Sequence, residues 1–228
     1  MILIIILFFS YPNFSKNKLN YTVLGDKKIF SNNIISKNFS DLLYDEIKNK
    51  KEITYNKDFV LENIRIIDII NFIKENQKIS DSTIQKILKD SNILIINVGN
   101  NELNYKLSKY DINTNNDKEI YLYLNQTLND YADLLNLIRN YSDQTIIILG
   151  LYNDTNIKEN DKYYKYINSK LKNKIKSNEI FIDTFDILNK NNDYITKTSP
   201  SYITNKGNLA LFNKTYDKIN NLYLHKPF

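Results

Sequence analysis

The residues Leu19 to Lys28 read LNYTVLGDKK, an apolar run rich in β-branched and aromatic side chains that ends at Gly25-Asp26. Such a run predicts a buried strand, and the Gly-Asp pair predicts a tight turn into a helix. In an open α/β sheet, ligands bind beyond the carboxyl ends of the strands, and the turn after the first strand is a usual place for a reacting group. Lys27 occupies that place.

Apolar runs alternate with helical patterns along the rest of the chain. This alternation predicts a three-layer α/β domain, with helices on both faces of a five-stranded parallel sheet. Because the connections are long enough for right-handed crossovers, we expect the flavodoxin-like strand order 2-1-3-4-5. The polar residues 104–118 are expected to form a loop at the edge of the site. The expected strands lie near residues 20–25, 53–55, 93–98, 145–149 and 179–183, and the helices over 34–50, 64–73, 80–89, 119–139, 158–176 and 205–224.

Glycine is scarce in this chain. About 7% glycine is typical, so ~16 glycines are expected in a chain of this length, whereas the sequence has four. They occur in the segments V-L-G-D, I-N-V-G-N-N-E, I-I-I-L-G-L-Y and Y-I-T-N-K-G-N, as Gly25, Gly99, Gly150 and Gly207. In that order and spacing, the segments resemble those of the SGNH hydrolases, also called GDSL esterases and lipases, over residues 19–224.

The resemblance implies a fold and a chemistry. In this family a serine follows Gly-Asp after the first strand, and a histidine near the C-terminus, three residues after an aspartate, removes the serine proton. The oxyanion is held by the serine N–H, by a glycine N–H after the second strand and by an asparagine side chain after the third. These groups supply what acyl transfer needs: a nucleophile, a nearby base, and donors aimed at the developing charge.

Most of these positions are replaced in this chain. Lys27 stands at the serine position, and counting back from Gly207 places Ser199 and Tyr202 at the aspartate and histidine positions. No glycine occurs between Gly25 and Gly99, so a residue with a side chain, within 61–63, occupies the second donor position. Only the asparagine is retained. The expected ligand cleft contains Gly25, Asp26, Lys27, Gly99, Asn101 and Tyr202.

Other candidates for catalysis lack a partner. His225 is the only histidine, and it follows a predicted helix of ~18 residues, about 27 Å long, at the end far from the site. Lys27 as a nucleophile would need a lowered pKa, so a solvated lysine filling a vacated pocket is the favoured interpretation. Asp183, at the end of the fifth strand, is expected to cap structure and not to catalyse. Three serines near the predicted site have no visible base: Ser31, Ser199 and Ser201.

Composition narrows the class of protein. The length suits one domain, residues 19–228, with one sizeable core. Of the 31 basic residues only Arg65 and Arg139 are arginines, and the lysines are scattered among Asn, Asp and Glu. A nucleic-acid partner is therefore not expected. No cysteine is present, and neither metal-ligand spacing nor a Gly-rich phosphate loop occurs, so no metal and no cofactor are expected. The abundance of Asn, Lys, Ile and Tyr is typical of an AT-rich bacterial genome.

The first nine residues read MILIIILFF. They are too few to span a bilayer but match the apolar core of a short signal peptide. A basic segment before this core and a small-residue cleavage site are both missing, so an extra edge strand and a start inside a longer leader stay as alternatives. We interpret residues 1–18 as a leader or anchor remnant, with membrane attachment through residues 2–9. A secreted or membrane-anchored location is expected, with a cytoplasmic one as the alternative.

The sequence thus predicts an SGNH-like domain that has lost its triad. The favoured hypothesis is an inactive relative whose cleft binds a small anionic or carbohydrate-like ligand. A helix N-terminus beside Lys27 and Lys28 favours negative charge and supports the anionic form, with Asn101 as a further donor. Two alternatives stay open: an active esterase or acyl hydrolase with a displaced nucleophile, and a purely structural cell-surface domain.

Overall fold

Strand β1 (Leu19–Asp26) pairs in parallel with neighbours on both of its sides. The computed structural model describes residues 18–30, 37–109, 117–198 and 200–224. Within these residues the main sheet runs β2-β1-β6-β7-β8, and all its pairings are parallel. The predicted order 2-1-3-4-5 and the parallel sheet are therefore confirmed. The other strands of this row are β2 (Ile53–Asn56), β6 (Ile93–Asn97), β7 (Ile146–Leu149) and β8 (Ile180–Ile182).

The described residues also contain three two-residue strands, β3, β4 and β5. The two-residue strand β3 (Val60–Leu61) pairs with the last residues of β1, Gly25 and Asp26, and so extends the sheet toward the site. Away from this sheet, β4 (Lys78–Ile79) and β5 (Ser82–Thr83) form a short antiparallel pair.

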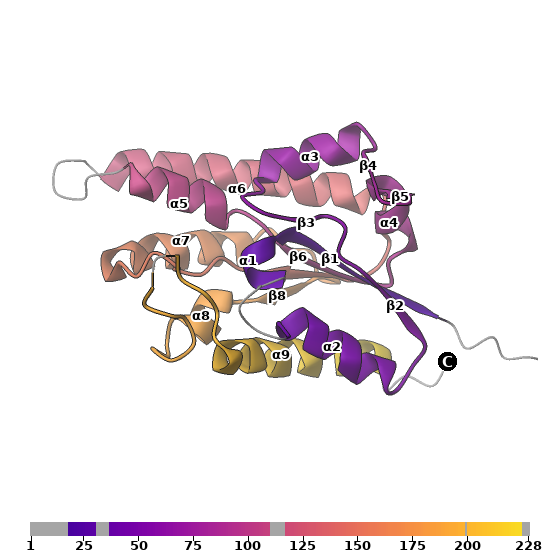
Figure 1. Cartoon of the computed structure of the whole chain (residues 1–228). Helices are drawn as coiled ribbons and strands as arrows, with labels where there is room; N and C mark the ends of the chain where they lie inside the picture. Colours follow the sequence, from indigo (N-terminus) through magenta and orange to yellow (C-terminus); the bar gives the residue numbers. More distant parts are fainter. Residues whose placement is uncertain (1–17, 31–36, 110–116, 199, 225–228) are drawn as a thin grey trace, which may run out of the picture.

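Helices cover both faces of the sheet, as Figure 1 shows with α3, α5 and α6 on one side and α2 and α9 on the other. Because successive strand residues point to opposite faces, β6 divides its side chains between two apolar cores: Leu94 and Ile96 join one, Ile93 and Ile95 the other. The helices are α1 (Lys27–Phe30), α2 (Phe39–Lys48), α3 (Ile66–Lys74), α4 (Ile84–Asp90), α5 (Asn100–Ser108), α6 (Asp117–Arg139), α7 (Asp161–Lys172), α8 (Thr184–Leu188) and α9 (Asn205–Ile219). The 3-10 turn η1 (Lys158–Asn160) precedes α7, and the π-helical turn η2 (Asn220–Leu224) follows α9.

The segment that was expected to be a loop, 104–118, is partly helical. Helix α5 runs through Ser108, and α6 already begins at Asp117. The loop prediction was wrong there because it weighed polarity alone. Leu103 and Leu107, four residues apart, are both buried against the core and hold α5 in place. Residues 110–116 lie outside the described residues.

Helix α2 also begins later than the expected residue 34. Asn38 is its N-cap: its side chain accepts from the N–H groups of Ser40 and Asp41, and Asp41 accepts in return from the Asn38 N–H. This reciprocal pair is a capping box, and it starts the helix at Phe39. Residues 31–36 lie outside the described residues.

Within the described ranges, no helix has both the length and the apolar character that crossing a bilayer requires. The apolar segment 1–9, to which membrane attachment was assigned, lies outside those ranges, so that assignment stays a prediction.

Candidate functional site

The ends of β1 and β6 approach each other closely at Gly25. This residue has φ 131°, and a Cβ atom placed on it would lie 1.7 Å from the carbonyl oxygen of Asn97. Only glycine fits such an approach and such a backbone angle. The contact brings the residue after Gly25, Asp26, next to the start of α5, which Gly99 caps with φ 108°.

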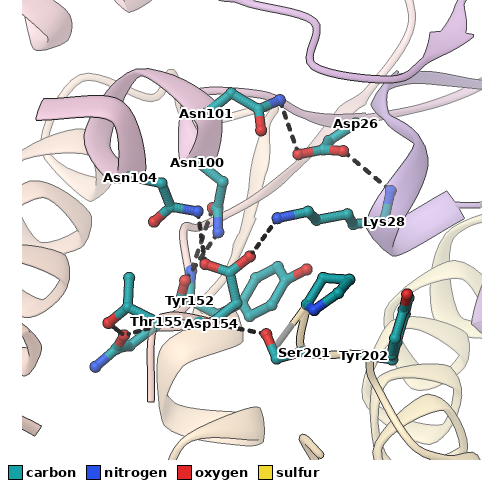
Figure 2. A network of polar contacts seen from close by, with 12 residues as sticks. Asp26, Lys28, Asn100, Asn101, Asn104, Tyr152, Asp154, Thr155, Ser201 and Tyr202 are labelled. Carbon is teal, nitrogen blue, oxygen red and sulfur yellow. Dashed lines mark hydrogen bonds and ion pairs between the residues drawn. The ribbon is translucent and has the colours of Figure 1, made fainter. Parts of the chain in front are cut away.

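Asp26 and Asn101, both expected in the cleft, are in direct contact (Figure 2). The Asn101 Nδ2 donates to Asp26 Oδ2 at 3.0 Å and also to the Ile64 carbonyl at 2.9 Å. The Lys28 N–H donates to Asp26 Oδ1 at 3.0 Å. Burial raises the pKa of Asp26 to about 6, although the Lys28 N–H, its ammonium group and Asn101 all oppose that rise.

The two neighbouring lysines point to different surroundings. Lys27 Nζ forms an ion pair with Glu62 Oε1 at 2.8 Å, and the Glu62 side chain is largely exposed. Lys28 instead extends into the site, where its Nζ lies 2.9 Å from Asp154 Oδ2 (Figure 2). Each lysine thus has a carboxylate partner. The anion site expected at this turn stays a prediction. Helix α1 has only four residues, and a helix this short adds little dipole to attract an anion.

Asp154 is the centre of a buried polar network. It follows β7, and only 3% of its side chain is exposed. Its second oxygen, Oδ1, accepts from Asn104 Nδ2 at 2.6 Å, and the Tyr164 hydroxyl donates to Asn104 Oδ1. Burial alone would lower the pKa of Lys28, but the Asp154 carboxylate raises it above its ordinary value. The amine of Lys28 is therefore held in its charged form.

Backbone contacts fix the segment that carries Asp154. Asn100 Nδ2 donates to the Tyr152 carbonyl at 2.8 Å, and the Tyr152 N–H donates back to Asn100 Oδ1 at 3.4 Å. Ser201 Oγ donates to the Asp154 carbonyl at 2.5 Å. The starts of α1 and α5 and the segments after β7 and before α9 therefore meet at this one network (Figure 2).

In the described residues, neither Tyr202 nor Asp183 is hydrogen-bonded to Asp26 or Asn101. Tyr202 is half-buried; its backbone N–H donates to Thr196 Oγ1 at 2.8 Å, and its ring lies to one side of the network in Figure 2. Asp183 is the N-cap of α8, as expected, and accepts from Asp186 N at 3.2 Å. The other candidates, Ser31, Ser199 and His225, lie outside the described residues.

A cleft of about 740 Å³ opens beside this network. Its ionisable lining residues are equal in number, two basic and two acidic: Lys28 and Arg65, Glu102 and Asp130. At the expected backbone-donor position, Asn63 adopts the left-handed conformation with φ 53°, which glycine usually takes. The other lining residues are Ile67, Asn101, Asn104, Tyr105, Ser108 and Tyr123.

Glu102 is the most unusual residue of this lining. Its Oε1 accepts from the N–H of Ile66, the first residue of α3, while Oε2 is buried without a hydrogen-bond partner. Burial raises the pKa of its carboxyl to about 7, against the opposing effect of the Ile66 N–H. Burial raises the pKa values of two tyrosines, Tyr123 and Tyr131, and the nearby Glu102 carboxylate raises them further.

No protein-family model and no curated protein matches the chain. Solved structures do. A lipase from a goat rumen metagenome superposes with a TM-score of 0.74 at 18% identity, over 87% of this chain and 96% of that one. An acetylxylan esterase from Geobacillus stearothermophilus, in a catalytic mutant, gives 0.65 at 12% identity, over 88% and 94%. A member of the lipolytic G-D-S-L family from Veillonella parvula gives 0.63 at 12% identity, over 91% and 100%.

The chain has the SGNH hydrolase fold. The fold expected from the four glycine segments is therefore confirmed. That Lys27, Ser199 and Tyr202 stand at the triad positions of SGNH hydrolases stays a prediction from the sequence.

The Asp154 network was missed by the sequence-based reasoning on the SGNH site. Asp154 lies four residues after Gly150, at the carboxyl end of a predicted strand, which is the signal that would have found it. Asn104 lies three residues after Asn101, on the same side of a helix once α5 is recognised. In a loop over 104–118, as expected from the sequence, this spacing would have no meaning. The described residues contain no group of three or more His, Cys, Asp or Glu residues that suits a metal ion.

Proposed function

We propose that this chain is a non-hydrolytic protein of the SGNH fold that binds a neutral, hydroxyl-rich ligand of carbohydrate type in the cleft beside Asn101. The observation that carries the proposal is the pair of lysines at the turn after β1. Lys27 faces outward to Glu62, and Lys28 is bound to a buried carboxylate. An ammonium group held in this way does not attack a carbonyl, because a lysine nucleophile must first lose its proton.

A displaced serine nucleophile finds little support at this site. Ser201 is buried, and its hydroxyl donates to the backbone carbonyl of Asp154 rather than to a base. A carbonyl oxygen cannot take up the proton that an attacking serine must lose. The only histidine of the sequence is His225, outside the described residues. Esterase activity is therefore the alternative that the hydrolysis test must detect if the proposal is wrong.

The lining of the cleft favours a neutral ligand over an anionic one. Beyond the equal numbers of basic and acidic residues, Arg65 pairs with Asp68 and Lys28 with Asp154, so neither cation is free for an anion. Tyr105 and Ile67 are 60% and 46% exposed and give the mouth an apolar surface. A pyranose ring offers an apolar face to such a surface and hydroxyl groups to amides and carboxylates. Two of the structural neighbours are named as carbohydrate-acting esterases, which supports this ligand class.

The test is a titration with xylotetraose, followed by NMR shifts of the backbone amides. The wild type is expected to bind saturably in the millimolar range, and Tyr105→Ala to lose that binding. Leu122→Ala is the matched control, because Leu122 is 61% exposed and does not line the cleft. Inorganic phosphate is titrated in parallel. Binding of phosphate but not of the sugar at these amides would overturn the neutral-ligand proposal, and binding of neither would favour the purely structural domain.

A further inference from the structure

A second cavity, of about 660 Å³, lies at the same edge of the sheet, beyond the segment that carries Asp154. Its walls are formed by residues that follow β7 and residues that follow α8, and it is open to solvent. We call it the basic cavity, since three lysines line it against a single carboxylate. The lysines are Lys158, Lys190 and Lys197, the carboxylate is Asp161, and Asn191 and Asn192 add side-chain amides.

Hydrogen bonds join the two walls of the basic cavity. Asn189 Nδ2 donates to the Asn153 carbonyl at 2.7 Å, and the Asn153 N–H donates back to Asn189 Oδ1 at 2.9 Å. Asn156, held at φ 59°, donates from Nδ2 to the Thr198 carbonyl at 3.2 Å. Because several bonds connect the walls, the cavity does not depend on one side chain for its shape.

The charges of the basic cavity do not balance. Lys190 pairs with Asp186 at 3.0 Å, and the lining carboxylate, Asp161, accepts from Asn153 Nδ2 at 2.6 Å. Lys158 and Lys197 have no ion-pair partner among the residues that the structure describes. The carboxylate of Asp193 is close enough to interact electrostatically with Lys197, but its ion-pair partner is Lys206, at 2.9 Å.

We propose that the basic cavity binds a compact oxyanion, a phosphate or carboxylate group, through the ammonium groups of Lys158 and Lys197, with the side-chain amides of Asn191 and Asn192 as further donors. Ammonium groups bind such oxyanions by charge-assisted hydrogen bonds. A hollow in which one sign of charge predominates also concentrates counter-ions. The cleft beside Asn101 differs in this respect, because basic and acidic residues are equal in number in its lining. The two cavities thus suit different ligands, and the oxyanion site does not depend on the carbohydrate proposal.

The experiment uses pyrophosphate and citrate as separate probes at constant ionic strength, followed by NMR shifts of the side-chain amides of Asn153 and Asn189. The wild type is expected to bind at least one probe saturably. The double variant Lys158→Ala/Lys197→Ala is expected to bind it about tenfold or more weakly, since two charged hydrogen-bond donors are lost. The preferred probe shows whether the ligand carries phosphate or carboxylate.

The matched control is Lys172→Ala/Lys174→Ala, which removes the same charge from exposed positions outside the basic cavity. It is expected to bind the probe as the wild type does. Equal weakening in both double variants would overturn the proposal, because net charge alone would then explain binding. The absence of saturable binding in the wild type would also overturn it. Tyr105→Ala is expected to retain oxyanion binding. The oxyanion proposal and the carbohydrate proposal can therefore fail independently of each other.

Discussion

Lys27 and Lys28 are adjacent in the sequence but make different contributions to the protein. Lys27 pairs with Glu62 at the surface, where ion pairs contribute little to stability. Lys28 pairs with a carboxylate whose side chain is 3% exposed, and removing one partner of a pair leaves such a charge uncompensated. At the residue scale, Lys27, which stands at the expected serine position, therefore contributes less to stability than Lys28.

The first prediction is that Lys28→Ala lowers the free energy of unfolding by about 1–3 kcal/mol, because Asp154 then keeps only the Asn104 donor. Lys27→Ala is expected to leave it unchanged within error. Urea unfolding of both variants measures the difference. In the double variant Lys28→Ala/Asp154→Asn, the loss is expected to be smaller than the sum of the single losses. Equal effects of the two lysine variants would contradict this account of the site.

At the element scale, the strands and their order were predictable because buried parallel strands are continuous apolar runs, as in β6 and β7. The start of α5 was not, since its sequence NNELNYKLS is polar and only Leu103 and Leu107 mark its buried side. Of the site, Asp26 and Asn101 were predicted together and do meet. Asp154 was missed because no SGNH motif covers it, although its place after a predicted strand puts it at the edge of the sheet where its partners from α1 and α5 lie.

The second prediction concerns Glu102, whose carboxyl joins α5 to the first N–H of α3. Burial raises its pKa from 4.5 to about 7. Between these values the folded chain binds more protons than the unfolded chain, so the free energy of unfolding falls as the pH rises from about 4.5 to about 7. Glu102→Gln is expected to reduce this slope in urea unfolding series. Asp26, whose pKa is raised from 3.8 to about 6, accounts for a remaining slope of the same sign. An unchanged slope in Glu102→Gln would show that this carboxyl titrates alike in both states.

At the scale of the whole molecule, an SGNH hydrolase fold presents two cavities of different charge at one edge of its sheet. The cleft beside Asn101 has equal numbers of basic and acidic lining residues, and the basic cavity carries two lysines without ion-pair partners in the described residues. The segment that carries Asp154 connects the two cavities. Asn153 lines the basic cavity, and the partners of Asp154, Lys28 and Asn104, line the cleft. Our proposal that the chain binds a ligand and does not transfer acyl groups rests on the expected nucleophile position, where Lys27 is ion-paired with Glu62.

The most direct test of this account is hydrolysis of p-nitrophenyl acetate and acetylated xylotetraose by the purified wild type, compared with the heat-denatured protein. The account predicts no turnover above that control, and no labelling of serine by a phosphonate, because the described site pairs no serine with a base. Turnover that is lost in Ser201→Ala, together with phosphonate on Ser201, would contradict it.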